Sequence, residues 1–127
     1  MMRRAQGGYA MSYMLLIVEP AGQRRARTEA EGRDMYDSML RFSADLKERG
    51  LLTLSQSLKT DAKATRVHRE GHESVIVDGP FAEAKEMIGG FFLLTCHERE
   101  VAVAIARECP AAAWATVEVR ELGPCFE

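Results

Sequence analysis

The segment DGPFAEAKE, residues 78–86, gathers acidic and basic side chains on one short stretch of chain. Gly and Pro after Asp78 favour a rigid turn that would display these side chains together. A carboxyl group held near an apolar ring can have its pKa raised into the range that suits proton transfer, and a lysine can stabilise a developing enolate. We therefore expect catalysis from Asp78, Lys85 and Glu86, and substrate binding from Pro80, Phe81 and Glu83.

The same segment also has a purely structural interpretation. Asp78 would then cap the turn, and Lys85 would pair with a glutamate to hold the loop. Both interpretations stay open from the residues alone.

Metal and cofactor sites are not predicted elsewhere in the chain. His68 and His72 have the i,i+4 spacing that suits a metal on a helix, but they fall on a predicted hairpin. Gly89 and Gly90 lack the spacing of a phosphate-binding loop, and inside a strand pattern they indicate a bulge or a close backbone approach. We expect no metal and no organic cofactor.

The elements that must position these residues follow from hydrophobic spacing. Tyr13 to Glu19 is a nearly continuous apolar run that predicts a strand buried on both faces. Thr28 and Glu31 have the spacing of a capping box, and the apolar stripe that follows predicts a helix ending at Gly50. A second helix is expected between Glu98 and Glu108, where Pro110 ends it.

Further strands are predicted between and after the helices. Alternation of apolar and hydroxyl side chains from Leu52 to Leu58 indicates a half-buried strand. A hairpin is expected around Gly71, which can supply the positive φ of a tight turn. The remaining strands are a central one over 88–95 and a last one over 116–120.

The predicted order is strand, helix, strand, hairpin, strand, helix, strand, or βαβββαβ with the hairpin counted as one unit. This order predicts an α+β, ferredoxin-like sandwich in which two helices cover one face of a mainly antiparallel sheet. A chain of this size can hide the second face against a second copy, so we expect a homodimer with a ligand pocket near its interface.

Composition excludes several classes of function. The 127 residues suit one domain over 12–127, preceded by a disordered extension at residues 1–11. Seventeen basic and nineteen acidic residues give a net charge of -2, which predicts no nucleic-acid partner. The longest apolar run, Met14 to Val18, is too short for a membrane span or a signal peptide, so a cytoplasmic protein is expected. The expected state of Cys96, Cys109 and Cys125 is reduced and partly buried.

The motif DGPF, followed by FAEAKE and IGGFFLL, resembles the DGPF branch of the YCII-related family. The resemblance extends from YMLLIVE to TVEVR, roughly residues 13 to 121. It implies a ferredoxin-like fold that dimerises through its sheet, as in dimeric α/β barrels. It also implies an acid–base pair of His and Asp near the dimer cleft. Asp78 matches the aspartate, whereas the stretch Arg33-Asp34-Met35-Tyr36, where the family has its histidine, contains none.

Two functions are expected from this reading. The first is a small-molecule-binding protein that catalyses isomerisation or elimination by acid–base chemistry at Asp78. The second is a non-catalytic sensing or regulatory module with a protein partner, because the resemblance implies a link to extracytoplasmic-function sigma factors. Asp78→Asn would separate the two.

Overall fold

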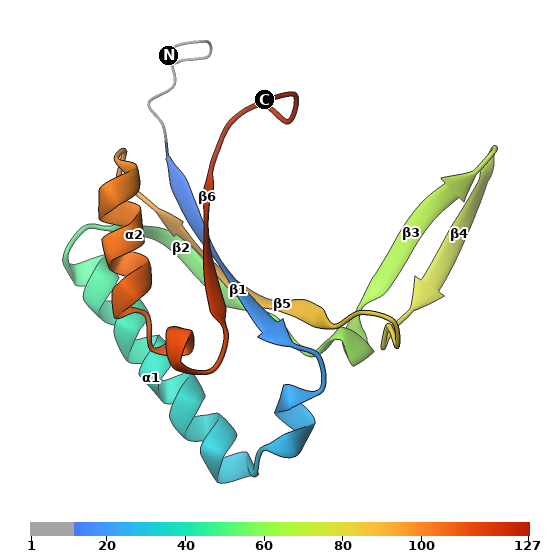
Figure 1. Cartoon of the computed structure of the whole chain (residues 1–127), viewed down its shortest axis with the longest axis horizontal. Helices are drawn as coiled ribbons and strands as arrows, with labels where there is room; N and C mark the ends of the chain where they lie inside the picture. Colours follow the sequence, from blue (N-terminus) through green and yellow to red (C-terminus); the bar gives the residue numbers. More distant parts are fainter. Residues whose placement is uncertain (1–11) are drawn as a thin grey trace.

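A computed structural model describes residues 12–127, so the extension expected at residues 1–11 lies outside the described residues. Its main sheet is antiparallel, with four strands in the order β2-β5-β1-β6. Two helices cover one face of this sheet, and a separate hairpin projects from its far end (Figure 1). The strands are β1 (Tyr13–Pro20), β2 (Leu52–Ser57), β3 (Thr65–Glu70), β4 (Glu73–Asp78), β5 (Glu86–Leu94) and β6 (Thr116–Glu121). The helices are α1 (Glu29–Glu48) and α2 (Arg99–Glu108), with short 3-10 turns η1 (Gln23–Ala26), η2 (Asp61–Lys63) and η3 (Pro110–Ala113).

The predicted α+β class and element order are confirmed. Helix α1 begins at the predicted capping box: Thr28 Oγ1 accepts from the Glu31 amide at 3.1 Å, and the Thr28 amide donates to Glu31 Oε1 at 2.8 Å. These two bonds satisfy amides that a helix start otherwise leaves without partners. Gly50, at φ 73°, ends the helical segment, because glycine adopts that backbone conformation without a steric cost.

The core lies between the helices and one face of the sheet. Alternate residues of β1 (Tyr13, Leu15 and Ile17) are buried there, because strand side chains alternate between faces. Leu46 of α1 and Ile105 of α2 are fully buried against them. Burying a side chain of this size stabilises the fold by about 1.5–3 kcal/mol.

The other face of the sheet carries no helix. The strand register places Leu54, Leu93, Met14 and Arg120 in one cross-strand row on this open face, and Gln56, Phe91, Leu16 and Glu118 in the next. The prediction that β1 is buried on both faces is therefore wrong for a single copy of the chain. Its residues on the open face are only half-buried, because no other layer of the chain covers them.

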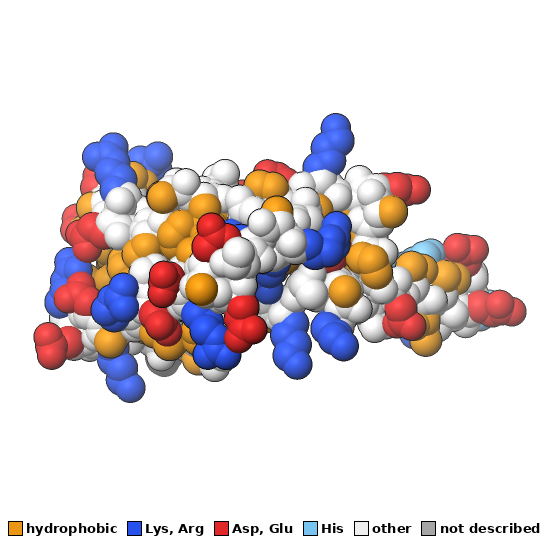
Figure 2. All heavy atoms as spheres, turned by 90° about the horizontal axis from the view of Figure 1, so that it is seen from below, with side chains coloured by type: hydrophobic (Ala, Val, Ile, Leu, Met, Phe, Trp, Pro, Cys, Tyr) orange, Lys and Arg blue, Asp and Glu red, His pale blue; other side chains and the backbone are white. Residues whose placement is uncertain are grey.

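The β3–β4 hairpin leaves the sheet as an arm with both faces in solvent. Gly71 forms its turn at φ 65°, as predicted. Val67 and Ile76 lie opposite each other in the register and are 63% and 65% exposed. Figure 2 shows hydrophobic side chains among the charged ones along this arm. Isolated two-stranded hairpins are marginally stable in water. The exposed apolar side chains of the arm form a surface that a partner could cover.

Within residues 12–127, no helix has the length and apolar character needed to cross a membrane.

Candidate functional site

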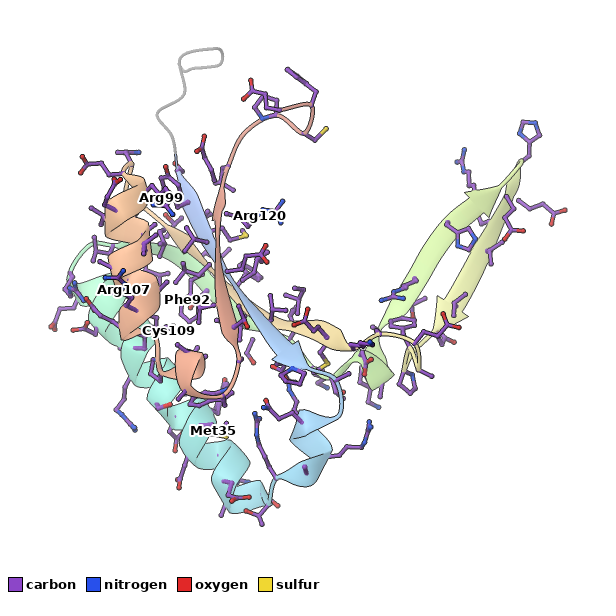
Figure 3. All side chains as sticks on the ribbon, in the orientation of Figure 1. Met35, Phe92, Arg99, Arg107, Cys109 and Arg120 are labelled. Atoms are coloured by element: carbon purple, nitrogen blue, oxygen red, sulfur yellow. The ribbon has the colours of Figure 1, made fainter. Side chains whose placement is uncertain are left out.

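A cavity of about 620 Å³ lies between the N-terminal half of α1, the turn η1 and the sheet. We call it the helix-side pocket. This volume is in the range of small-molecule sites. Its apolar lining includes Ile17, Met35, Met39, Leu40, Phe92 and Trp114. Figure 3 labels Met35 on α1 and Phe92 on β5, which belong to the helix wall and the sheet wall of this pocket.

Glu19, at the end of β1, places a carboxylate in the wall of the helix-side pocket. It is 4% exposed, and no other charged residue within 12–127 is buried to that degree. Both carboxylate oxygens accept from Arg24: Nε donates to Oε1 at 2.7 Å and Nη2 to Oε2 at 3.1 Å. A buried carboxylate needs such a partner, because the loss of hydration would otherwise be prohibitive. The two-point contact fixes the position of the carboxylate.

Arg24 is itself held by main-chain oxygens from two other segments. Nη1 donates to the carbonyl of Leu58 at 2.7 Å and Nη2 to that of Gly89 at 3.4 Å. The guanidinium therefore joins the end of β1 to β5 and to the chain just after β2. The site has a rigid polar end built from three parts of the sequence.

Gly89 and Gly90 allow the sheet to approach these groups. Neither has room for a side chain: an added Cβ on Gly89 would overlap Glu19 Oε2, and one on Gly90 would lie 2.9 Å from the Gln56 carbonyl oxygen. The register also shifts between Ile17 and Val18, opposite this pair. The predicted close approach and bulge are both confirmed.

Hydroxyl groups form a second polar wall. Ser43, Ser55 and Ser57 line the helix-side pocket, and Ser43 Oγ lies 2.9 Å from Ser55 Oγ across the α1–β2 contact. The hydroxyl side of β2 therefore faces the helix, and Leu54 lies on the open face, 46% exposed. This arrangement supplies donors and acceptors to a bound molecule.

A second cavity of about 690 Å³ lies at the base of the hairpin, beside the open face of the sheet. We call it the loop-side pocket. Phe81 and Glu86, two of the predicted site residues, line it together with Val18 and Ile88 of the open face. The Phe81 ring lies under Arg66, whose guanidinium carbon is 3.7 Å from the ring centroid. This cation–π contact ties the loop to the hairpin.

The other predicted site residues lie outside both pockets. Asp78 is exposed at the end of β4, where Oδ1 accepts from Thr65 Oγ1 at 2.9 Å across the hairpin. Lys85 is exposed, and no carboxylate of residues 12–127 lies within ion-pair distance of it; Pro80 and Glu83 are also exposed. The structure thus brings Phe81 and Glu86 to one pocket and leaves Asp78, Pro80, Glu83 and Lys85 at the surface.

The helix stretch without a histidine belongs to the helix-side pocket. Arg33, Met35 and Tyr36 line it, whereas Asp78 does not. The two positions that the resemblance would pair therefore do not share a cavity in this chain. Glu19, five residues before Arg24, supplies the carboxylate that faces the same cavity as the helix.

Glu19 and Arg24 are not among the site residues predicted from the sequence. The apolar run places Glu19 at the end of a strand, and Arg24 falls in the polar connection that follows it. The available signal was a charge at the end of an otherwise apolar run, because a strand that buries its neighbours also buries that charge.

Side-chain clusters able to hold a metal are absent from the part of the chain that the structure describes. His68 is exposed on the hairpin, with Nε2 3.1 Å from Glu70 Oε2. The cysteines are free: Cys109 is buried, Cys96 is half-buried and Cys125 is exposed. Burial raises the pKa of the Cys109 and Cys96 thiols, because it disfavours the thiolate.

Comparison with known proteins adds a family and one relative. The model of the YCII-related domain matches residues 11–125. A stretch of 55 residues is 40% identical to an uncharacterised protein of Rhizobium meliloti strain 1021. That stretch covers 43% of this chain and 44% of the relative, so the match spans less than half of either protein.

Proposed function

The chain belongs to the YCII-related domain family, and we propose that it binds a small organic molecule in the helix-side pocket, where Glu19 transfers a proton on it. The observation that carries the proposal is the buried carboxylate of Glu19 in the wall of that cavity. A carboxylate in a low-dielectric cleft is the group that acid–base enzymes use to move protons.

The contacts of Glu19 suit a base that must stay in one place. Arg24 binds both oxygens, but a carboxylate has about four lone-pair sites, so each oxygen can still accept from a ligand. Gly89 has no side chain, so the β5 backbone packs directly against the carboxylate and helps to hold it in place. Positioning of this kind lowers the entropic cost of bringing base and substrate together.

The proposed reaction is an isomerisation of a small carbonyl compound. Glu19 accepts a proton from the carbon next to the carbonyl group and returns it to another carbon, so the carboxylate is regenerated. A serine hydroxyl of the pocket donates a hydrogen bond to the enolate oxygen while the charge is there. The reaction changes no oxidation state overall, and acid and base chemistry from the side chains is sufficient for it.

Hydrogen exchange tests this proposal without knowledge of the natural substrate. Small ketones and keto acids are incubated with the protein in D₂O, and exchange at the carbon next to the carbonyl is followed by NMR. We expect wild type to catalyse exchange and Glu19→Gln to lose it by at least about 100-fold. Asp78→Asn is the matched variant from the surface loop and should retain exchange. Circular dichroism checks that both variants fold.

Asp78 remains the competing candidate from the sequence. The loop-side pocket lies near its loop, and Phe81 and Glu86 line that pocket. If Asp78→Asn removed exchange while Glu19→Gln retained it, the catalytic group would be in the surface loop, with Lys85 and Glu86 as supporting residues.

A non-catalytic regulatory module is the second candidate function. The exposed apolar side chains Val67, Ile76 and Val77 on the hairpin arm favour it, because they give a protein partner a surface to cover. A sigma factor of the extracytoplasmic-function type is one candidate for this partner. Binding of ligand without exchange of any test compound, together with loss of partner binding on Ile76→Asp, would favour this function.

We also propose that the protein is a homodimer that pairs its open sheet faces, in the manner of a dimeric α/β barrel. Leu16, Phe91 and Leu93 form an apolar centre on that face, and β6 adds the Glu118–Arg120 ion pair at its edge. A face of this kind is self-complementary under a two-fold axis. The loop-side pocket would then lie beside the interface, since Val18 and Ile88 belong to both.

A further inference from the structure

Arg27 is the arginine of the helix-side pocket that forms no ion pair within residues 12–127. The other two arginines of the lining are paired: Arg24 with Glu19 at 2.7 Å, and Arg33 with Glu29 at 2.8 Å. Within residues 12–127, no carboxylate lies within ion-pair distance of Arg27. The charged side chains of the pocket therefore carry one positive charge in excess.

The guanidinium of Arg27 is held at the pocket wall by a chain of two contacts. Its Nη2 donates to Gln23 Oε1 at 2.5 Å, and Gln23 Nε2 donates to the carbonyl oxygen of Trp114 at 2.8 Å. Gln23 thus joins Arg27 to the segment that carries the aromatic ring of the pocket. A guanidinium has five N–H donors, so most of those on Arg27 remain for a ligand.

The backbone near Arg27 adds to the positive potential. Arg27 comes directly before Thr28, the N-cap of the 20-residue helix α1, and both line the pocket. A helix start carries a partial positive charge. The carboxylate of Glu31 attracts Arg27 and offsets part of this potential, but it lies outside the lining and accepts from the Thr28 amide at 2.8 Å.

We propose that the ligand of the helix-side pocket is a small organic carboxylate, whose anionic group binds Arg27 and whose apolar body lies against Met35, Met39, Phe92 and Trp114. This inference rests on the proposed function and names its ligand class. Because Arg24 neutralises Glu19, the base does not repel an anionic ligand. Arginine binds a carboxylate through two parallel N–H bonds, which would also orient the ligand in the cavity.

The sequence provides a built-in probe, because Trp114 is the only tryptophan of the chain and lines this pocket. Its fluorescence is followed while the full-length protein is titrated with phenylacetate and, separately, with phenylacetamide, which has the same shape and no charge. We expect phenylacetate to bind at least about tenfold more tightly, as a charge-assisted hydrogen bond predicts.

Three variants make the test specific. Arg27→Gln should lower the affinity for phenylacetate about tenfold and leave that for phenylacetamide unchanged. Arg27→Lys keeps the charge and should restore part of the affinity. Arg25→Gln, at an exposed neighbour outside the lining, should bind like wild type. Thermal melting of each variant checks its fold.

Two results would overturn the inference. Equal binding of phenylacetate and phenylacetamide would show a pocket without anion preference, and an unchanged affinity in Arg27→Gln would place the anion elsewhere. Either result leaves the proposed proton transfer by Glu19 intact, since the exchange assay tests it with ketones as well. If Glu19→Gln loses exchange and either of these binding results is found, the proposed function stands and only the ligand class is rejected.

Discussion

Glu19 and Gly89 lie so close that a single methyl group on Gly89 would overlap Oε2 of the Glu19 carboxylate. The same methyl group would lie 2.9 Å from Nη2 of Arg24. Both obstacles are the ends of flexible side chains, so the backbone can remain while the ion pair moves. Gly89 is thus required by the geometry of the site more than by the fold.

We predict that Gly89→Ala displaces the Glu19–Arg24 pair and removes proton exchange and ligand binding. The loss in free energy of unfolding should be about 1–3 kcal/mol, as for other overpacked sites. Urea denaturation and the exchange assay measure the two effects. Gly32→Ala is the stability control, because an added Cβ there meets nothing within 4 Å and alanine favours a helix. Full activity in Gly89→Ala would contradict the assigned site.

Gly79 presents the opposite case, at the loop that the sequence singled out. A Cβ there would overlap the backbone carbonyl oxygen of Asp61, and the Gly79 amide donates to the carbonyl of Ala64 at 2.8 Å. The obstacle is main chain, so it cannot rotate away. We predict that Gly79→Ala destabilises the base of the hairpin. Amide exchange in β3 and β4 should then be faster than in wild type, with a smaller change in β1. Unchanged protection of the hairpin would show that the loop adapts easily.

The order and type of the elements could be predicted because local signals agree with the fold. The Thr28 and Glu31 capping box and the stop at Gly50 bound α1 correctly, since both act through neighbouring backbone groups. The site could not be read in the same way. Glu19 and Arg24 meet across Gly22, which has φ 84°, and the carbonyl of Gly89, from a distant strand, completes the contacts of Arg24.

The sequence also could not show whether the charged residues of the segment 78–86 face a cavity. A cluster of charges such as residues 78–86 is visible without a structure, but exposure decides whether such charges face a cavity. Asp78 and Lys85 are exposed, and only Phe81 and Glu86 line a pocket. The assignment of catalysis to Asp78 stays a prediction, as does the cytoplasmic location.

Helix α1 should be sensitive to acid through its capping box. The hydrogen bonds from the Thr28 backbone and side chain lower the pKa of Glu31. A lowered pKa in the folded state contributes stability that is present above the ordinary carboxyl range and is lost as the pH falls through the folded value. We predict that Thr28→Ala costs about 1 kcal/mol at neutral pH. Urea denaturation at neutral and acid pH should show a smaller cost in acid; an equal cost at both would contradict the role of Glu31.

The three thiols should react in the order of their exposure. Cys125 is exposed, whereas burial raises the pKa of the Cys96 thiol and, with fuller burial, that of Cys109. The thiolate is the reactive form, so a raised pKa slows reaction at mildly alkaline pH. With a chromogenic disulfide reagent we expect Cys125 to react first, Cys96 more slowly and Cys109 only after unfolding. Cys125→Ser should remove the fast phase; if that phase persisted, a core thiol would be accessible.

The open sheet face gives the last prediction. Leu16 lies at its centre, opposite Phe91 on β5 and Glu118 on β6, and no helix covers it. A dimer that pairs this face would bury Leu16 twice, and an aspartate there would be desolvated beside the like charge of Glu118. We predict that Leu16→Asp converts a dimer to a folded monomer in sedimentation velocity. Phe126→Asp is the control, because Phe126 is 85% exposed and lies beyond the last strand. If wild type sedimented as a monomer, or Leu16→Asp stayed dimeric, the sheet face would not be the interface, and the apolar hairpin arm would become the surface to test.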